Sequence, residues 1–511
     1  MNPEILLLII LFIASFALLL TNFDLSVFVM LVLSVLLHKE LFSIFKWDVL
    51  PIRLFMLAFL CYGVLAFFKT NKTFKEKLTF FKDPFVLILT LIWVVSGFSI
   101  YFSKNLYSSL SLYGFFTCIV ASVLALYRYF RGDIERPLKV LRFYMYLAAV
   151  LCLFCVFQAA YYLKTGHIIG ALWNIPGNIP RLGATFWDVN HFGALLAALI
   201  PPLGAFFLAT KKRKRLIYLA MLILMTGILF LTNSRSAWII AGVSSLSFIS
   251  LLLFRKVGKK GLVGLGVVIL ILFAGFFWEY SDRTSPFRKF IKDQFHYRID
   301  SFDSHIMLLK GSYQIFEKYP FLGGGYGGFF EHFSQTDIAA EYFGRDPAAL
   351  NTRVPAHTIW GEALSETGIV GFVLLVSFVV LLLVVPLYTA LRSNDRIKVL
   401  LSSAIFSALL GWFIAGIFYS YKSEFFWIII TLYFSISVGL LEKGVTVRSI
   451  LARLTKSRLS FLVIALTAFI LVFSGLGRNH LIPWDEAIYA KIAKNMTDSG
   501  EYVSQYWKPV E

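Results

Sequence analysis

Charged residues are scarce in this sequence, and acidic residues are the scarcest. Asp, Glu, Lys and Arg make up 15% of the 511 residues, with 29 acidic against 48 basic side chains. Soluble globular proteins carry about 25% charged and roughly 45–50% apolar residues, whereas 59% of this chain is hydrophobic. The 53 Phe and only 15 Pro also exclude a disordered chain. The composition therefore predicts an all-α, polytopic integral membrane helical bundle.

Cysteine is nearly absent as well. The four cysteines, Cys61, Cys118, Cys152 and Cys155, all lie within apolar runs. The C-x-x-C pair formed by the last two has no nearby partner ligands, so the sequence predicts neither a metal nor a cofactor there.

Long apolar runs recur along the whole chain. At about 20 residues per span, we expect about 13–14 transmembrane helices and one membrane unit. No fixed-period repeat or linker is visible. Four parts are expected: N-terminal transmembrane helices at 1–163, a core with its external loop at 164–390, C-terminal core helices and a basic cytoplasmic loop at 391–458, and an extra transmembrane helix with an external tail at 459–511.

The excess of 48 basic over 29 acidic residues gathers in short loops between apolar runs. Such loops are cytoplasmic by the positive-inside rule, so no nucleic-acid partner is expected. The two clearest loops, 211–215 and 255–260, are separated by two apolar runs, which places the turn at 232–235 outside. The next run, 262–278, must then cross outward. The long polar segment at 279–357 is therefore predicted to be an external loop.

The external loop is longer than a connection requires, and loops of that length are usually functional or disordered. Ile306, Leu309, Tyr313 and Phe316 recur at helical spacing, which predicts an amphipathic helix over 303–318 on the bundle or the membrane surface. The Tyr-Pro pair that follows ends it.

A glycine-rich stretch and a histidine follow that helix. Residues 323–328, with Tyr326 among five glycines, either form a turn or let backbone N–H groups approach a ligand. They are not a Walker loop, since no Lys-Ser or Lys-Thr follows. His357 closes the loop at the outer mouth of the bundle, where a neutral imidazole can take a proton from a hydroxyl group. A histidine that merely sits at the interface is the alternative.

Four arginines fall on the same predicted side: Arg181, Arg235, Arg298 and Arg353. The guanidinium group is suited to bidentate recognition of phosphate. Each one taken alone could be a lipid-headgroup contact. Arg235 differs, because a charge at a span boundary beside Trp238 is unfavourable unless it faces a polar cavity.

Four segments between about 181 and 371 carry a family resemblance: RLGATFWDVNHFG, TNSRSAW, EKYPFLGGGYGGF and AHTIWGEALSETGIVG. In this order and with the large loop outside, they resemble the O-antigen ligase and O-antigen polymerase superfamily. Members are polytopic enzymes that move glycans from a polyprenyl diphosphate to an acceptor outside the membrane. The resemblance implies an enzyme of the cell (inner) membrane whose active site faces the extracytoplasmic side.

The resemblance also implies roles for residues. His357 would be the catalytic base and Arg235 would engage the diphosphate without a metal, while Arg181, Arg353 and Tyr326 are further candidates for substrate binding. The implied partners are the lipid bilayer, a polyprenyl-diphosphate-linked glycan donor and a glycan, lipid or protein acceptor.

Two positions depart from the family pattern. Thr358 stands where many members have Asn. His305 stands where many have Arg, and Arg298 lies seven residues earlier on nearly the same helical face. We expect Arg298 to substitute, and keep His305 as a candidate.

The tail carries a second resemblance. Residues 483–500, with the acidic pair Asp485 and Glu486, resemble the first external loop of the protein-mannosyltransferase and aminoarabinose-transferase (GT-C) class. The tail is then either a truncated fusion with such an enzyme or an external cap. An amphipathic helix with a solvated acidic start is the alternative.

Two other functions compete with glycan transfer: secondary transport and non-catalytic glycan binding. Transporters place ionisable groups or broken helices near the bilayer midplane. The spans here are nearly free of charge, and Pro201-Pro202 within one span is the feature that most favours transport.

Overall fold

The structure is a computed structural model of the whole chain, and it is overwhelmingly helical. The residues that it describes are 3–36, 42–44, 47–69, 79–173, 180–186, 188–267, 270, 299–345, 347, 350, 354–417, 420 and 423–455. It divides into two compact units, 1–447 and 448–511. The second unit is described only through residue 455, where helix α20 (Val447–Thr455) ends.

The elements of the first unit follow one another in three groups. The N-terminal group comprises α1 (Pro3–Thr21), α2 (Phe23–Leu36), β1 (Phe42–Ile44), β2 (Trp47–Val49), α3 (Pro51–Lys69), η1 (Phe80–Lys82), α5 (Pro84–Ser99), η2 (Ile100–Phe102), α6 (Leu106–Phe130) and α7 (Glu135–Thr165). The middle group comprises β3 (Leu172–Trp173), β4 (Arg181–Leu182), α8 (Val189–Ala209), α9 (Lys212–Leu231), α10 (Arg235–Val257), α13 (Ile299–Lys318), α14 (Phe329–Phe333) and α15 (Ala339–Arg345). The last group comprises α17 (Ile359–Arg392), α18 (Arg396–Ala415) and α19 (Glu424–Gly439).

Eight helical stretches among the described residues are long and apolar enough to cross a membrane, namely α5 with η2, α6, α7, α8, α9, α10, α17 and α18. Four shorter apolar helices lie in α1, α2, α3 and α19. Helices satisfy their own backbone hydrogen bonds, which a bilayer requires. The prediction of an all-α polytopic membrane bundle is confirmed. Most of the span predicted at 262–278, and all of 459–511, lie outside the described residues.

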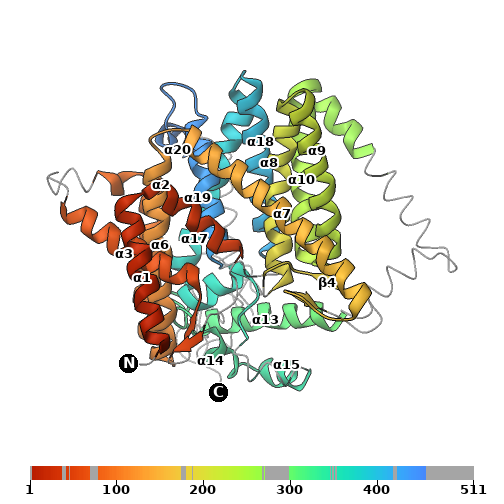
Figure 1. Ribbon diagram of the computed structural model, residues 1–511. Helices are drawn as coiled ribbons and strands as arrows, with labels where there is room; N and C mark the ends of the chain where they lie inside the picture. The colour runs from red at the N-terminus through yellow and green to blue at the C-terminus, as the bar shows by residue number, and fades with distance from the viewer. Residues whose placement is uncertain are drawn as a thin grey trace, which may run out of the picture. The chain divides into compact units, whose positions relative to one another are not determined.

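Helices α8, α9, α10 and α18 stand side by side in Figure 1. Close approach of α18 to α10 depends on Gly411, because a Cβ there would lie 2.6 Å from the carbonyl oxygen of Ile240. At one end of this group, Arg255 donates to the carbonyl oxygens of Leu391 and Ser393. At the same end, Arg396, the first residue of α18, donates to the carbonyl of Leu208 in α8 at 3.1 Å. The basic loops that the sequence assigns to one side thus meet at one end of the bundle.

The Pro201-Pro202 pair lies inside α8 without interrupting it. Pro202 has no N–H, so the carbonyl of Ala198, four residues earlier, lacks its helical donor. The hydroxyl of the fully buried Tyr433 on α19 donates to that carbonyl at 2.7 Å. The Tyr433 hydroxyl thus replaces the missing helical donor. The proline pair therefore does not create the broken helix that a transporter would use.

Replacing Tyr433 by Phe is expected to lower the free energy of unfolding by about 1–3 kcal/mol, because it leaves a buried carbonyl without a donor. Thermal unfolding in detergent measures the effect. Tyr144→Phe is the matched control: this buried hydroxyl bonds the Ser34 hydroxyl, which also bonds the carbonyl of Leu31 at 2.7 Å. The control should lose less stability. Equal losses would contradict this role of the Tyr433 hydroxyl.

The other end of the bundle carries α13, which crosses beneath the upright helices in Figure 1, with α14 and α15 beside it. The antiparallel pair β3–β4 lies at the same end. The helix predicted over 303–318 is confirmed, and it ends at Lys318, directly before the Tyr-Pro pair. This end holds the polar segments that the sequence analysis singled out.

Candidate active site

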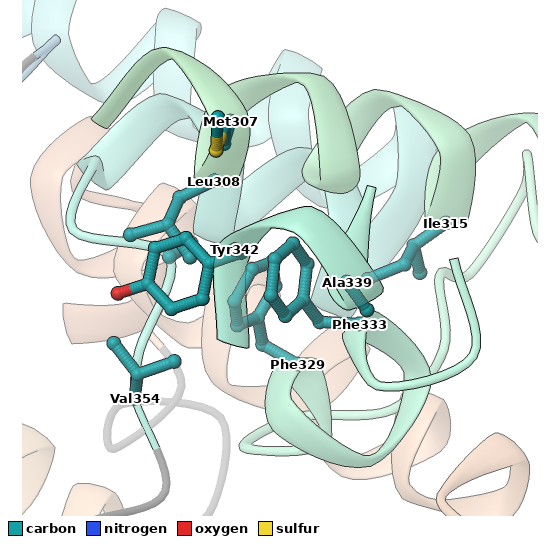
Figure 2. Packing of buried hydrophobic residues seen from close by; sticks show 9 residues of the cluster. Met307, Leu308, Ile315, Phe329, Phe333, Ala339, Tyr342 and Val354 are labelled. Atoms are coloured by element: carbon teal, nitrogen blue, oxygen red, sulfur yellow. The ribbon is translucent and has the colours of Figure 1, made fainter. Parts of the chain in front are cut away.

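One face of α13 is buried against the bundle. It differs by one position from the predicted face, since Leu309 is 40% exposed while Leu308 is 1% exposed. The reason is Gly311, where a Cβ would lie 2.4 Å from the ring of Phe333, so α14 packs on this face. Figure 2 shows the apolar cluster beneath the helix, made of Met307, Leu308, Ile315, Phe329, Phe333, Ala339, Tyr342, Val354 and Ala356.

Helix α13 also packs on the first turn of α17. A Cβ at Gly361 would lie 2.8 Å from the hydroxyl of Ser312, so only glycine allows this contact. Thr358 is the N-cap of α17: its hydroxyl oxygen accepts from the backbone N–H of Gly361 at 3.3 Å and lies 3.2 Å from the carbonyl of Gly416. The backbone N–H of Ile359 donates to the same carbonyl at 2.9 Å. The start of α17 is thus fixed between α13 and the end of α18.

His357 precedes that cap and meets His305 of α13. The two imidazole rings have centroids 5.6 Å apart and are nearly perpendicular, at 88°. His357 has a φ of +51°, a conformation that few non-glycine residues adopt. Two of the other three such residues described, Ala184 and Asn233, belong to segments that meet at this end. Unfavourable backbone conformations of this kind cluster at functional sites.

Arg181 holds the turn that precedes α10. Its guanidinium donates to the carbonyl of Thr232 at 2.9 Å and to the side-chain oxygen of Asn190 at 2.9 Å. Gly193 brings α8 against the same turn, because a Cβ there would lie 3.1 Å from the Thr232 hydroxyl. Arg235, the first residue of α10, is thereby set beside the start of α8. Arg181 is 7% exposed and links two helix starts.

Burial favours the neutral form of both imidazoles near pH 7, because it lowers the pKa of each. Burial lowers the pKa of His305 to about 4, with further lowering by His357 and by the positive charge of Arg235. Burial also lowers the pKa of His357, while two carboxylates, Glu362 and Asp188, oppose this effect and His191 adds to it. These influences place α8, α10, α13 and α17 around one polar centre. A neutral imidazole in that setting can accept a proton.

Two carboxylates of this centre were not identified as candidates from the sequence. Glu362 is 3% exposed, and the hydroxyl of Ser420 donates to its Oε2 at 2.8 Å. Asp188 caps α8 by accepting from the backbone N–H of Asn190 at 2.7 Å. Both lie within the quoted motifs, so a search for acidic residues next to the candidate base would have found Glu362.

The glycine-rich stretch forms a turn against α17. The backbone N–H groups of Gly324 and Gly325 donate to the carbonyls of Ser365 and Glu366, next to the kink of α17 at Gly368, where φ is +62°. Those N–H groups therefore bond the backbone of α17, as expected if the stretch is a turn.

Tyr326 packs against α6. Its ring stacks on Phe116 with centroids 5.4 Å apart, and it lies 6.4 Å from the ring of Tyr113. Its backbone N–H donates to the hydroxyl of Ser99 at 3.0 Å. These contacts attach the glycine-rich turn to the N-terminal helices.

Four sequence candidates fall outside the described residues: Arg298, Arg353, Asp485 and Glu486. The structure joins His357, His305 and Arg235 in one electrostatic cluster, with Arg181 supporting the turn beside Arg235. Within the part of the chain that is described, no group of three or more His, Cys, Asp or Glu side chains could hold a metal ion.

Comparison with known proteins adds one finding. Residues 220–376 match the family model described as O-antigen ligase. This stretch contains Arg235, His305, His357 and Glu362. No curated protein matches the chain. The match supports the O-antigen ligase superfamily for this part of the chain and, with the eight apolar helices, indicates a glycan-transfer function in a membrane.

Proposed function

We propose that the protein is a glycosyltransferase that moves a glycan from a polyprenyl-diphosphate carrier to an acceptor hydroxyl at the extracytoplasmic face. The observation that carries the proposal is the meeting of His357, His305 and Arg235, from three separate segments, at one end of the bundle. Glycan transfer needs a base for the acceptor and positive charge for the leaving diphosphate, and these residues supply both.

The base is His357. A sugar hydroxyl is a weak nucleophile until its proton is removed. Burial keeps the pKa of this imidazole below its ordinary value, so its neutral, proton-accepting form prevails at neutral pH. The perpendicular His305 ring beside it is neutral too, and its Nδ1 is buried without a hydrogen-bond partner among the described residues. That nitrogen is available to a bound substrate.

The diphosphate site is centred on Arg235. Three helices, α8, α10 and α17, begin around the polar centre, and a helix start carries partial positive charge and exposed backbone N–H groups. Arg235 adds a guanidinium at the start of α10, and Arg298 and Arg353 remain proposed contributors to substrate binding. Positive charge that gathers there can balance a departing polyprenyl diphosphate. Lipid, protein and glycan acceptors need the same base and the same positive site.

The proposed sidedness follows from the two ends of the bundle. The basic loops meet at the end where Arg255 and Arg396 bond the neighbouring helices, and basic loops favour the cytoplasm. The histidines lie at the opposite end, with α13 across it (Figure 1). The donor glycan would therefore be met outside the cytoplasm.

Labelling of single cysteines tests the sidedness. A cysteine at the exposed Asp337 should react with a membrane-impermeant maleimide in intact cells, and a cysteine at the exposed Lys259 should react only after permeabilisation. Both variants are made in a chain whose four natural cysteines are replaced by Ala. The reverse pattern would place the histidines in the cytoplasm and overturn the proposal.

A reconstituted reaction tests the activity. Purified protein in liposomes, given a polyprenyl-diphosphate glycan and an acceptor, should release polyprenyl diphosphate and extend the acceptor. A polyprenyl-monophosphate sugar should not be consumed, because the proposed positive site balances the charge of a leaving diphosphate. A transporter would move the intact donor across the bilayer, and a glycan-binding protein would retain it. Either result without release of polyprenyl diphosphate contradicts the enzyme.

A further inference from the structure

Glu362 is a buried carboxylate that the proposed reaction does not yet use. It lies in the first turn of α17 and is 3% exposed. A buried carboxylate is unfavourable unless it is hydrogen-bonded or paired with positive charge. Ser420, from the segment between α18 and α19, donates to its Oε2 at 2.8 Å and fixes the direction of the carboxylate. The residue is therefore held in place by a contact from outside its own helix.

The start of α17 brings Glu362 towards His357. Thr358 is the N-cap, so His357 occupies the position before the cap and Glu362 is the fourth residue of the helix. These two positions are neighbours in space at a helix start, where apolar residues often pack against each other; here they hold an imidazole and a carboxylate instead. In agreement, the charge of Glu362 is the largest electrostatic influence on the pKa of His357 after burial, and it raises that pKa.

We infer that Glu362 is the positioning residue of the base: its carboxylate, aligned by Ser420, orients the His357 imidazole and stabilises the imidazolium that forms during transfer. This inference rests on the proposed function. The acceptor hydroxyl gives its proton to the imidazole, and its oxygen forms a bond to the anomeric carbon. The bond from that carbon to the diphosphate oxygen breaks, and its electron pair leaves with the polyprenyl diphosphate. The imidazolium then lies beside the carboxylate until it loses the proton.

Other charged and titratable groups besides Glu362 also surround His357 and influence its pKa. Asp188 and His191 face it from α8, and His305 faces it from α13. Arg235 of α10 acts on His305. Asp188 already caps α8 through the N–H of Asn190. Glu362 is the carboxylate on the same helix start as the base, so the start of α17 positions both residues.

Glu362→Gln in the full-length protein tests the inference, because Gln keeps the shape and an acceptor for Ser420 but removes the charge. The pKa of His357, followed by NMR with labelled histidine in nanodiscs, should fall by about one unit. The low-pH limb of kcat/KM should move to lower pH, since the base then loses its proton more easily. The plateau rate should fall by roughly tenfold or more, because the imidazolium is no longer stabilised.

Glu366→Gln is the matched control. Glu366 is 6% exposed on the same helix, one turn further on, and its carbonyl bonds the glycine-rich turn. This change should leave the titration of His357 as it is in the wild type. Ser420→Ala serves as a second variant and should shift the pKa of His357 in the same direction as Glu362→Gln, by less.

Three results would overturn the inference: an unchanged His357 titration in both Glu362→Gln and Ser420→Ala, an equal shift in Glu366→Gln, or a shifted titration with an unchanged transfer rate. These outcomes are separable from a failure of the proposed function, which appears as transfer that survives loss of His357 itself. If His357 is required and Glu362→Gln titrates like the wild type, only the positioning role is wrong.

Discussion

Glycan transfer should fall by about 10²–10⁴-fold when His357 is replaced by Ala, the range that a positioned general base contributes. Removal of the imidazole leaves the acceptor hydroxyl protonated, while the diphosphate site around Arg235 is untouched. Binding of the donor should therefore persist, so the loss is in kcat rather than in KM for the donor. Release of polyprenyl diphosphate from a defined donor, at several donor concentrations, measures both quantities.

His167→Ala is the control for this change. His167 is exposed, beyond the end of α7, and its removal should leave transfer unaffected. Both variants should reach the membrane and unfold at wild-type temperatures, because neither removes a large apolar contact. Transfer by His357→Ala at close to the wild-type rate would show that another group takes the proton.

The local features of the site could be predicted from the sequence because they depend on short-range patterns. Helical spacing and the Tyr-Pro pair predicted α13 and its end. The long apolar run that follows the polar loop forms the part of α17 beyond the kink at Gly368. His357 was singled out from its place between a polar loop and an apolar run, and the structure sets it beside a second histidine.

The contacts between segments could not be predicted in the same way. The buried face of α13 is set by Gly311 and Ser312, whose small side chains admit Phe333 and Gly361, and hydrophobic spacing favoured Leu309 instead. The bonds of Arg181 to Thr232 and Asn190 could not be predicted either, and its role as a substrate contact stays a prediction. Such pairings depend on which helices become neighbours, and a single sequence does not show that.

The glycine-rich stretch shows a further limit of sequence patterns. Its composition allowed both a ligand-binding loop and a turn, and the partners of its N–H groups distinguish the two. Gly324 and Gly325 donate to α17 at a point where Gly368 interrupts the helix. A glycine there also has a geometric reason: a Cβ at Gly323 would lie 2.4 Å from the carbonyl carbon of Glu366. The glycines thus fix the helix whose start His357 precedes.

Arg235→Lys should lower transfer by about 10- to 100-fold even though the charge is kept. A hydrogen bond to a charged group contributes about 1.5–3 kcal/mol, and each 1.4 kcal/mol is a factor of ten in rate. The planar guanidinium donates two parallel hydrogen bonds to a diphosphate, whereas an ammonium group acts as a point charge. The shorter lysine side chain also moves the positive charge away from His305, so the pKa of that imidazole should rise.

The matched control for this change is Arg215→Lys. Arg215 lies over the ring of Phe207 in the first turn of α9, at the opposite end of the bundle, and the same substitution there should leave transfer unchanged. A defect confined to Arg235→Lys, with kcat/KM for the donor reduced and the KM for the acceptor unaltered, would locate the lost contact on the diphosphate. Wild-type kinetics in Arg235→Lys would remove Arg235 from the diphosphate site. The base could then still act, but the charge of the leaving group would have to be balanced by other residues.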